Sequence, residues 1–404
     1  MLSVEEARTR VLAAFSPLQA EQISLIDGLG RVLAENVQSR RTQPPVAVSA
    51  MDGYAVRHED VATPPVTLNI IGHAPAGGQH DGELAPGQCV RIFTGGPVPT
   101  GADTIVIQEN TEAEGDQVTI QTSAAKGHYI RPAGLDFQAN EIGLFAGQVM
   151  TARDVGFAGA MNVPWLMVHR KPRIAILATG DEIAMPGDPL GPNQIVSSNS
   201  LALASFIRAR GGVAISLGIA PDDREALKAM ANGARGADLL VTTGGASVGD
   251  HDLVQSVLGE LGFELDFWRI AMRPGKPLIF GSIGETPVLG LPGNPVSTIV
   301  CAIIFMLPAI ERMLGISAVK QPRLTARLKT PLPENDQRED YLRATLEHDN
   351  NGGLIAVPFA KQDSSMLSRM ARADCLIIRA PHAPPSAAGD VIEYLPIPEG
   401  LAKV

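Results

Sequence analysis

Between residues 172 and 316, short apolar segments alternate with amphipathic ones, and this alternation constrains the fold more than any other feature. Strands are predicted at 174–177, 213–219, 239–243, 278–280 and 288–291, and helices at 200–210, 222–234, 252–261 and 295–313. Strands that alternate with helices form layered units whose strands run mostly parallel. We therefore predict a central α/β sandwich over residues 172–316.

The segments on either side of this unit differ from it in composition and in the spacing of their apolar residues. Residues 43–140 consist of short Val, Ile and Thr runs divided by Pro and Gly, which predicts a β-rich domain. Residues 317–404 alternate in a similar way and predict a small β barrel or sandwich, of which we choose the barrel. Residues 1–42 begin with helical spacing and residues 141–171 return to it, so we predict that both stretches form one discontinuous linker domain. The expected fold class is multidomain α/β plus β.

Charge and cysteine content argue against several classes of protein. The formal net charge is -10 without any basic run, which argues against general nucleic-acid binding, because backbone phosphates repel an acidic surface. The three cysteines, Cys89, Cys301 and Cys375, are widely spaced without a CxxC pattern. We expect buried thiols, and neither a disulfide framework nor a zinc site.

Membrane and export signals are not expected either. The longest apolar run, 296–310, is interrupted by hydroxyl residues and Pro308 and is shorter than the roughly 20 residues that span a bilayer. It predicts a buried helix. The N-terminal residues include Glu5 and Glu6 and show no basic segment before an apolar core, so we expect a cytoplasmic protein.

Four loops of the α/β unit carry residues that suit anionic ligands. They are LATGDE at 177–182, TTGGASVGDHD at 242–252, RPGKP at 273–277 and GLPGNP at 290–295. In open parallel sheets, ligands bind beyond the carboxyl ends of the strands, where glycine loops and helix N-termini present backbone N–H groups. The two cations of the third loop add charge-assisted hydrogen bonds to an oxyanion. Taken singly, each loop also fits a connecting turn, a helix cap or a solvated charge.

The β-rich domain and its surroundings hold further candidates. SAMDGYA at 49–55 and RIFTGGPVP at 91–99 are its sharpest loops. Asp136 and Asp222 are carboxylates that suit a metal ion, and a turn or helix cap is an equal alternative for each.

Seven segments together resemble one known family. They are SAMDGYA (49–55), FTGGPVPTGAD (93–103), GLDF (134–137), ATGDEI (178–183), TTGGASVGDHD (242–252), RPGKP (273–277) and GLPGNPVS (290–297). In order and spacing they are similar to the MoeA-type molybdopterin molybdenumtransferases, which include the gephyrin E domain. The resemblance implies four structural domains, the third shared with molybdopterin adenylyltransferases. It also implies an elongated homodimer whose cleft combines the third domain of one subunit with the second domain of its partner.

The resemblance, together with the loop pattern, implies roles for individual residues. The catalytic set is Asp52, Thr94, Glu182 and Asp252. The set that binds the pterin is Gly244, Gly245, Ser247, Asp222, Pro292 and Pro295. The set that binds molybdate is Arg273, Lys276, Ser297, Arg343 and Ser364. The metal candidates are Asp52, Asp136, Glu182 and Asp252.

The implied reaction inserts molybdate into adenylyl-molybdopterin, with Mg²⁺ bound and AMP released, during molybdenum cofactor biosynthesis. It needs no protein nucleophile, because the sulfur ligands of molybdenum belong to the pterin. The expected partners are these small-molecule substrates, a second copy of the chain and the molybdopterin adenylyltransferase.

Two positions depart from the family pattern. Val46-Ala47-Val48 replaces the aromatic and polar pair that usually precedes SAMDGYA, and Arg273 stands where lysine is common. A guanidinium hydrogen-bonds oxyanions differently from an ammonium group, so tungstate stays open as an alternative to molybdate.

Three other functions use the same loops: a carrier of finished cofactor, an interaction scaffold and an adenylyltransferase. Carriage of an anion gives no reason for carboxylates at Asp52, Glu182 and Asp252. Adenylyl transfer needs only the α/β unit, whereas this chain has three further predicted domains. The sequence therefore favours the molybdenumtransferase.

Overall fold

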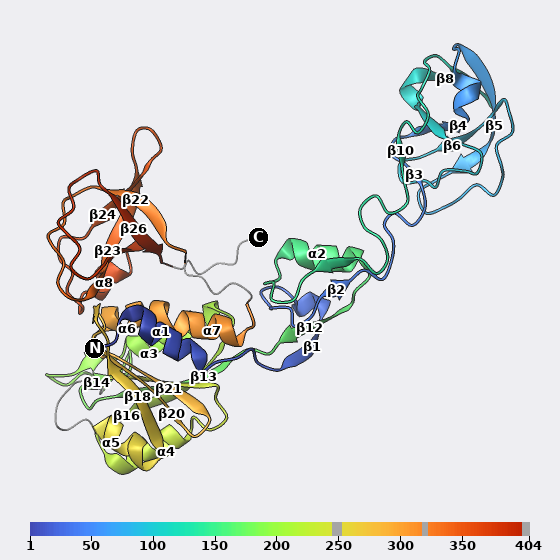
Figure 1. Ribbon diagram of the computed structural model, residues 1–404. Helices are drawn as coiled ribbons and strands as arrows, with labels where there is room; N and C mark the ends of the chain where they lie inside the picture. Colours follow the sequence, from blue (N-terminus) through green and yellow to red (C-terminus); the bar gives the residue numbers. More distant parts are fainter. Residues whose placement is uncertain (245–252, 317–321, 398–404) are drawn as a thin grey trace.

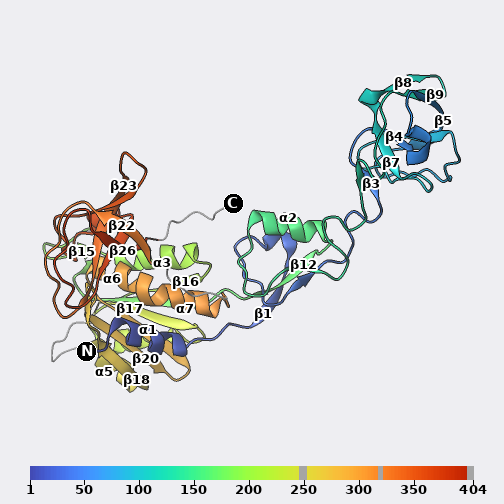
Figure 2. The same cartoon turned by 45° about the horizontal axis from the view of Figure 1, so that its top comes forward.

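The molecule is elongated, with a β-rich lobe at one end and two packed lobes at the other (Figure 1). A computed structural model describes residues 1–244, 253–316 and 322–397. The α/β unit and the C-terminal lobe lie together, and a small linker unit separates them from the β-rich lobe. The same separation is visible after a turn of 45° (Figure 2).

The α/β unit is built on a six-stranded sheet with the order β16-β13-β17-β21-β20-β18. Its strands are β13 (Arg173–Thr179), β16 (Val213–Ala220), β17 (Leu239–Thr243), β18 (Phe263–Arg269), β20 (Pro277–Ile283) and β21 (Thr286–Leu291). The first four in spatial order run parallel. Strand β20 is antiparallel to both of its neighbours, β21 and β18. A connection of only two residues joins β20 to β21, and such a short connection requires antiparallel strands. The predicted, mostly parallel α/β layer is confirmed.

Helices cover both faces of this sheet. One face carries α1 (Val4–Ala13), α3 (Asn199–Ala209), α6 (Pro295–Cys301) and α7 (Leu307–Met313), and the other carries α4 (Arg224–Asn232) and α5 (Leu253–Glu260). Between α6 and α7 a π-helical turn, Ala302–Met306, precedes Pro308, which lacks the N–H of a regular α-helix. By length and composition the helix Pro295–Met313 could cross a membrane, but it is 83% buried within the molecule. It is a core helix, as predicted.

Helix α1 lies on the α/β unit, whereas the sequence pattern assigns residues 1–42 to the linker. Val4, Ala7 and Val11 are buried in the same hydrophobic core as Ile304 of the long helix. An amphipathic helix must bury its apolar stripe, but the spacing of that stripe does not identify the surface that covers it.

The linker unit combines two stretches that are distant in sequence. Strand β1 (Ala20–Ser24) pairs with β12 (Trp165–His169), and β2 (Val37–Gln38) pairs with β11 (Ile142–Leu144), both antiparallel. Helix α2 (Ala152–Ala160) and the 3-10 helix η1 (Leu25–Asp27) pack beside them. Two narrow antiparallel ribbons therefore run through the middle of the molecule.

The distant lobe is a six-stranded sheet with the order β7-β4-β6-β5-β9-β8. Its strands are β4 (Gly53–Val56), β5 (Val66–Ala74), β6 (Gln88–Ile92), β7 (Thr104–Ile107), β8 (Thr111–Glu114) and β9 (Gln117–Ile120). Two 3-10 helices, η2 (His58–Val61) and η3 (Gln108–Asn110), connect them. Strands β3 (Val48–Ser49) and β10 (Ile130–Arg131) form a short ribbon where this lobe meets the linker.

The C-terminal lobe is a five-stranded barrel. Its elements are β22 (Leu324–Leu328), β23 (Glu339–His348), β24 (Leu354–Pro358), α8 (Leu367–Met370), β25 (Cys375–Arg379) and β26 (Val391–Pro396). The order is β23-β24-β22-β26-β25, and an additional pairing of β23 with β25 closes the barrel. The short strand β19 (Met272–Arg273) of the α/β unit pairs with β23 from outside. The predicted small barrel is confirmed.

Candidate functional site

A cavity of about 490 Å³ lies at the carboxyl ends of the parallel strands. Segments that follow β13, β17 and β21 contribute Glu182, Gly244, Pro292, Pro295 and Ser297 to its wall. These residues come from the predicted catalytic, pterin-binding and molybdate-binding sets. The topology explains their meeting, since the ends of parallel strands share one edge of the sheet. We call this space the strand-end cavity.

Gly244 sits where no larger residue fits. Its φ is +94°, and a Cβ atom there would lie 2.4 Å from the carbonyl oxygen of Thr179, so strand β13 approaches the glycine loop very closely. Gly293 of the next loop lies against Gly244 as well. The other predicted residues of the glycine loop, Gly245, Ser247 and Asp252, lie outside the described residues.

Asn199 is a site residue that the sequence analysis missed. Its side-chain amide donates to the hydroxyl of Thr243 at 3.0 Å and to the carbonyl of Gly293 at 2.7 Å. It therefore connects the ends of two adjacent strands within the wall of the strand-end cavity. The polar run Ser197-Ser198-Asn199, where helix α3 begins at Asn199, is the signal that could have identified it, but the run also fits an ordinary helix start.

Glu182 lies at the base of a small flap formed by β14 (Ile183–Ala184) and β15 (Ile195–Val196). Its carboxylate folds back over Gly180, where a Cβ atom would lie 2.5 Å from Glu182 Oε2. Ile183, Ile195 and Val196 give the flap side of the cavity an apolar surface. An exposed carboxylate thus stands beside an apolar wall.

Asp222 follows β16 at the same edge of the sheet but is exposed and outside the cavity wall. Its backbone N–H donates to Asp181 Oδ1 at 2.9 Å. Asp222 therefore lies beside the cavity, and its backbone N–H is hydrogen-bonded to the loop that follows β13.

The start of the long helix joins the cavity to the C-terminal barrel. Asn294 donates to the hydroxyl of Ser364 at 2.9 Å, and the Val296 N–H donates to the carbonyl of Ser364 at 3.1 Å. Ser297, in the first turn, is buried at 4% exposure and faces the cavity. Ser364 and Ser297 are thus brought together as members of the predicted molybdate set.

Two cations of the predicted molybdate-binding set, Lys276 and Arg343, lie near the strand-end cavity; the first is exposed and the second is buried. Lys276 is exposed and directly precedes Pro277, which lines the cavity. Arg343 is buried, and its guanidinium donates to Gln362 Oε1 at 3.0 Å and to the Asp363 carbonyl at 2.7 Å. Burial lowers the pKa of Arg343, and the nearby charge of Arg369 lowers it further. Arg343 therefore supports the loop that carries Ser364.

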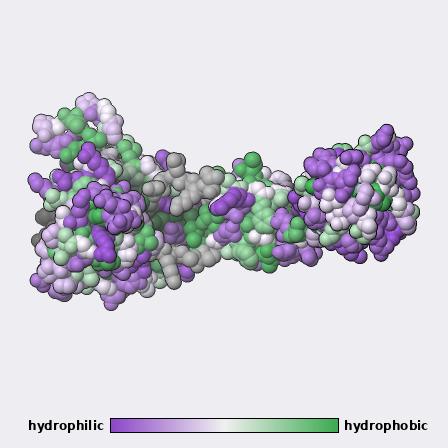
Figure 3. Space-filling model, turned by 90° about the horizontal axis from the view of Figure 1, so that it is seen from above, coloured by the Kyte–Doolittle hydropathy of each residue, from purple (hydrophilic) through white to green (hydrophobic). Residues whose placement is uncertain are grey.

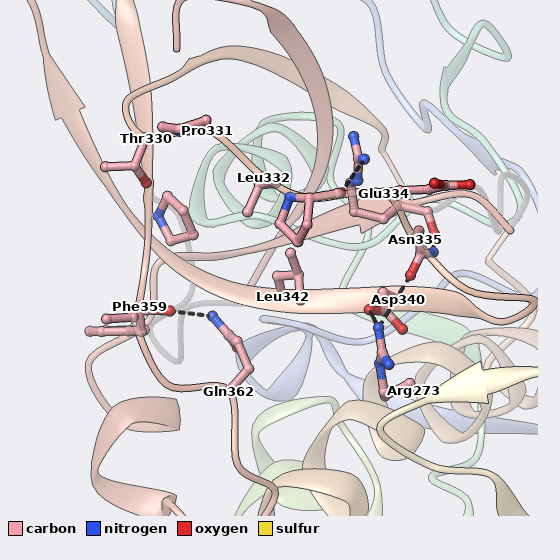
Figure 4. Close-up of a pocket in the computed structure, with 14 residues that line it drawn as sticks. Arg273, Thr330, Pro331, Leu332, Glu334, Asn335, Asp340, Leu342, Phe359 and Gln362 are labelled. Atoms are coloured by element: carbon pink, nitrogen blue, oxygen red, sulfur yellow. Dashed lines mark hydrogen bonds and ion pairs between the residues drawn. The ribbon is translucent and has the colours of Figure 1, made fainter. Parts of the chain in front are cut away.

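Arg273 is not brought to the strand-end cavity. Its guanidinium forms ion pairs with Asp340 and Asp336 and donates to Asn335 Oδ1 at 3.2 Å. It lines another cavity, at the C-terminal barrel (Figure 4). The hydrogen bond to Asp340 raises the pKa of Arg273. Arg273 therefore connects the α/β unit to the barrel.

Asp52 and Thr94 form a pair in the β-rich lobe. Asp52 Oδ1 accepts hydrogen bonds from the Thr94 N–H at 2.7 Å and from its hydroxyl at 2.8 Å. Both bonds lower the pKa of Asp52, and the charge of Arg91 adds to the effect. The same Arg91 guanidinium lies 5.0 Å from the ring of Phe93. Within one chain this lobe lies far from the strand-end cavity (Figures 1 and 2).

Asp136 lines a third cavity, of about 640 Å³, where the β-rich lobe meets the linker. Its neighbours there include Arg131 and Gly95, which follows Thr94 in the chain. Val46 and Val48, from the segment that departs from the family pattern, also line it. Asp136 therefore belongs to the region of Asp52 rather than to that of Glu182.

The described residues of one chain do not bring the predicted metal-binding carboxylates together. Among the described residues, no group of three or more His, Cys, Asp or Glu side chains could hold a metal ion. Asp52 and Glu182 belong to lobes at opposite ends of the molecule (Figure 1). One chain alone therefore gives no shared metal position for these two carboxylates.

Family comparisons cover most of the chain. The model described as "MoeA N-terminal region (domain I and II)" matches residues 2–161, "Probable molybdopterin binding domain" matches 175–312, and "MoeA C-terminal region (domain IV)" matches 325–397. These three matches follow the lobes of the structure in order.

Known relatives and a solved structure agree with this. The molybdopterin molybdenumtransferase of Nostoc sp. is 38% identical over 344 residues, which cover 82% of this chain and 78% of the relative. That of Haemophilus influenzae is 30% identical and covers 98% of both chains. The crystal structure of a molybdopterin biosynthesis MoeA protein from Pyrococcus horikosii matches with a TM-score of 0.86 and 32% identity, over 98% of this chain and 99% of that one. The chain belongs to the MoeA family of molybdopterin molybdenumtransferases.

Proposed function

We propose that this chain transfers molybdenum from molybdate to adenylyl-molybdopterin and releases AMP. Molybdenum transfer is the activity for which its relatives are named. The observation that carries the proposal is the strand-end cavity, where Glu182, Gly244 and Ser297 meet in one wall.

The pterin nucleotide occupies the flap side of this cavity in our proposal. Ile183, Ile195 and Val196 offer an apolar surface to the flat ring system. Gly244 packs closely on strand β13 and has no side chain, so an anionic phosphate can approach its backbone. Glu182 stands beside both groups.

Molybdate binds at the opposite side, near the start of the long helix. Helix N-termini attract anions, and here Ser297 of the first turn lines the cavity, while Ser364 is hydrogen-bonded to Asn294 and Val296 of the same helix start. Lys276 is exposed and supplies a positive charge next to Pro277 of the cavity wall. Arg343 contributes by holding the loop of Ser364 in place. Arg273 stays outside this site, because its ion pairs with Asp336 and Asp340 hold it at the barrel.

The complete site requires a second copy of the chain. The Asp52–Thr94 pair cannot reach the strand-end cavity of its own chain, because it lies in the opposite lobe. Large exposed apolar side chains gather on the linker, and the centre of the molecule is correspondingly apolar in Figure 3. They include Ile26 (83% exposed), Phe145 (58%) and Trp165 (52%). An apolar surface of this kind supports a homodimer in which linkers pack together.

Magnesium and location complete the proposal. A cation shared by Asp52 and Glu182 is possible only across such a dimer, so no reaction step is assigned to it. The three cysteines are free and buried, which suits a reducing cytoplasm. The molybdopterin adenylyltransferase remains the proposed donor of the adenylylated pterin.

A single-turnover reaction with adenylyl-molybdopterin, molybdate and Mg²⁺ tests the activity. Wild type is expected to release one AMP per molybdenum-loaded pterin, whereas Glu182→Gln and Asp52→Asn are expected to be at least about tenfold slower. The matched controls Glu225→Gln on α4 and Glu112→Gln on β8 replace exposed carboxylates of the same two lobes and should react normally. Absence of AMP release by wild type would refute the proposed function.

Co-expression of the two slow variants tests the shared site. In a dimer of Asp52→Asn with Glu182→Gln, one of the two composite sites contains no substitution. Random pairing then restores roughly a quarter of wild-type activity. If the mixture is no faster than either variant alone, the site is not built from two chains.

A further inference from the structure

A second cavity, of about 410 Å³, lies at one end of the C-terminal barrel (Figure 4). Its wall contains Asp340 of β23, Arg379 of β25 and the segment 330–335. Leu332 and Leu342 line it and also pack against the barrel core. The cavity is therefore the mouth of the barrel, a frequent position for small-molecule sites. It shares no wall residue with the strand-end cavity.

One oxygen of the Asp340 carboxylate lacks a hydrogen-bond partner among the described residues. Asp340 Oδ2 accepts from Arg273, but Oδ1 is buried and has no hydrogen-bond partner in the described part of the chain. The side chain of Asp340 is only 4% exposed. Because an unpaired buried acceptor is unfavourable, folded proteins rarely retain one without a ligand or water to satisfy it.

The donors nearest to Asp340 are committed elsewhere. Arg379 faces Asp340 across the β23–β25 pairing, yet its guanidinium donates to Ser386 and to the carbonyls of Pro333, Ala383 and Pro384. The amide of Asn335 donates to the carbonyls of Arg338, Arg379 and Ala380. The fold therefore fixes its own donors and leaves Asp340 Oδ1 for a group that enters the cavity.

The charges next to Asp340 indicate the charge and the hydrogen-bonding groups of a ligand that would bind there. Arg273 already balances the charge of Asp340, so a neutral ligand suffices. Figure 4 shows Arg273 beside Asp340. A guanidinium has five N–H groups, and three of those of Arg273 donate to Asp336, Asn335 and Asp340, so two have no partner among the described residues. The pair therefore offers a spare donor as well as the acceptor Oδ1. The complement of such a pair is a cyclic amide, whose N–H and C=O lie on one edge of the ring. The wall of the same cavity also contains apolar side chains, namely Pro331, Pro333, Pro358 and Phe359.

We propose that the barrel mouth binds a planar heteroaromatic lactam, with its ring N–H on Asp340 and its carbonyl on Arg273. Oxopurines and pterins share this chemistry, and both fit the description. The inference does not depend on the molybdenum-transfer reaction, which uses the other cavity.

Calorimetric titration of the full-length protein with hypoxanthine and with pterin tests the proposal. We expect saturable binding of at least one, and at least tenfold weaker binding of the matched 1-methylhypoxanthine or 3-methylpterin, which lack the lactam N–H. The tighter of the two parent compounds identifies the source, and equal affinities support the shared lactam chemistry. Failure of both parents to bind would overturn the proposal.

Two variants locate the binding. Ala360→Trp fills the cavity mouth without changing Asp340, and Asp340→Ala removes the acceptor; each should remove one binding site from the measured stoichiometry. Glu334→Gln, an exposed residue of the same wall, is the control and should bind within twofold of wild type. A stoichiometry that Ala360→Trp leaves unchanged, as expected if pterin binds at the strand-end cavity only, contradicts the proposal. AMP release is measured separately, so a failure here is distinguishable from failure of the proposed function.

Discussion

Thr94 donates both its backbone N–H and its hydroxyl to a single carboxylate oxygen of Asp52, at 2.7 and 2.8 Å. These bonds favour the ionised carboxylate, so the pKa of Asp52 is below its ordinary value. Thr94→Val removes the hydroxyl donor and is expected to raise the pKa of Asp52. Since the ionised form is then lost at a higher pH, the acidic limb of the activity profile should move to higher pH as well.

Carbon-detected NMR titration of the Asp52 carboxyl group, in wild type and in Thr94→Val, measures this shift. Thr100→Val, at an exposed threonine of the same lobe, is the control and should leave the titration unchanged. An unchanged Asp52 titration in Thr94→Val would show that the hydroxyl is not what stabilises the carboxylate.

Gly244→Ala is expected to be far more damaging than a comparable substitution elsewhere. Gly244 and Gly30 both have positive φ, +94° and +73°, but a Cβ at Gly30 meets nothing within 4 Å, whereas at Gly244 it collides with the Thr179 carbonyl. Gly30→Ala should cost about 1 kcal/mol of unfolding free energy from backbone strain alone. Gly244→Ala should cost at least about 2 kcal/mol and weaken pterin binding. Urea unfolding of the two variants makes the comparison, and equal costs would contradict the close approach.

Asn199→Ala should loosen the strand-end cavity. The substitution removes the donor that connects the Thr243 hydroxyl to the Gly293 carbonyl, and a lost hydrogen-bonding partner of this kind costs about 1–3 kcal/mol. We expect lower stability together with a raised KM for the pterin substrate. Asn232→Ala removes a single bond to a helix carbonyl on α4 and serves as the control, with KM unchanged. A wild-type KM in Asn199→Ala would show that the two loops keep their positions without the amide.

Arg273→Ala should destabilise the protein in a pH-dependent way. Burial raises the pKa of Asp340, and the hydrogen bond from Arg273 acts against that rise. Without Arg273 the pKa of Asp340 in the folded protein rises further. A carboxyl group whose pKa is higher in the folded than in the unfolded protein destabilises the fold, increasingly so as the pH rises above the unfolded-state pKa. Arg273→Ala should therefore lower the free energy of unfolding by about 1–3 kcal/mol near neutral pH. The effect should be smaller below pH 3.8, the ordinary pKa of an Asp carboxyl group, where Asp340 is protonated in both the folded and the unfolded state.

Urea unfolding near pH 7 and near pH 3.5 measures the Arg273 effect. The double variant Arg273→Ala with Asp340→Asn, which has no buried charge at this position, should recover much of the loss at neutral pH. A loss that is the same at both pH values would exclude Asp340 as its cause.

The sequence predicts those parts of the molecule that depend on local periodicity and on strand ends. The apolar segments that became β13, β17 and β21 were identifiable because a strand buried on both faces needs a continuous apolar run. Once those strands are parallel, Glu182, Gly244 and Pro292 must share one edge of the sheet. The strand-end cavity is therefore foreseeable from the sequence.

Contacts between distant segments were not foreseeable in this way. Arg273 pairs with Asp340, 67 positions later, and neither residue carries a local signal of the other. The sequence therefore groups Arg273 with Lys276, its neighbour in the chain, although the folded protein directs it to the barrel. Asn199 was missed for a related reason, since its two partners lie 44 and 94 positions away.

The pairing of β19 with β23 has a mechanical consequence. Met272 and Arg273 lie in parallel register with Glu339 and Asp340, so backbone hydrogen bonds as well as side chains fasten the barrel to the α/β unit. This pairing favours movement of the two lobes as one unit. The narrow ribbons β1–β12 and β2–β11 connect this unit to the distant β-rich lobe. Because that lobe lies far from the connection, a small rotation of the linker on the α/β unit would displace the β-rich lobe by a large distance.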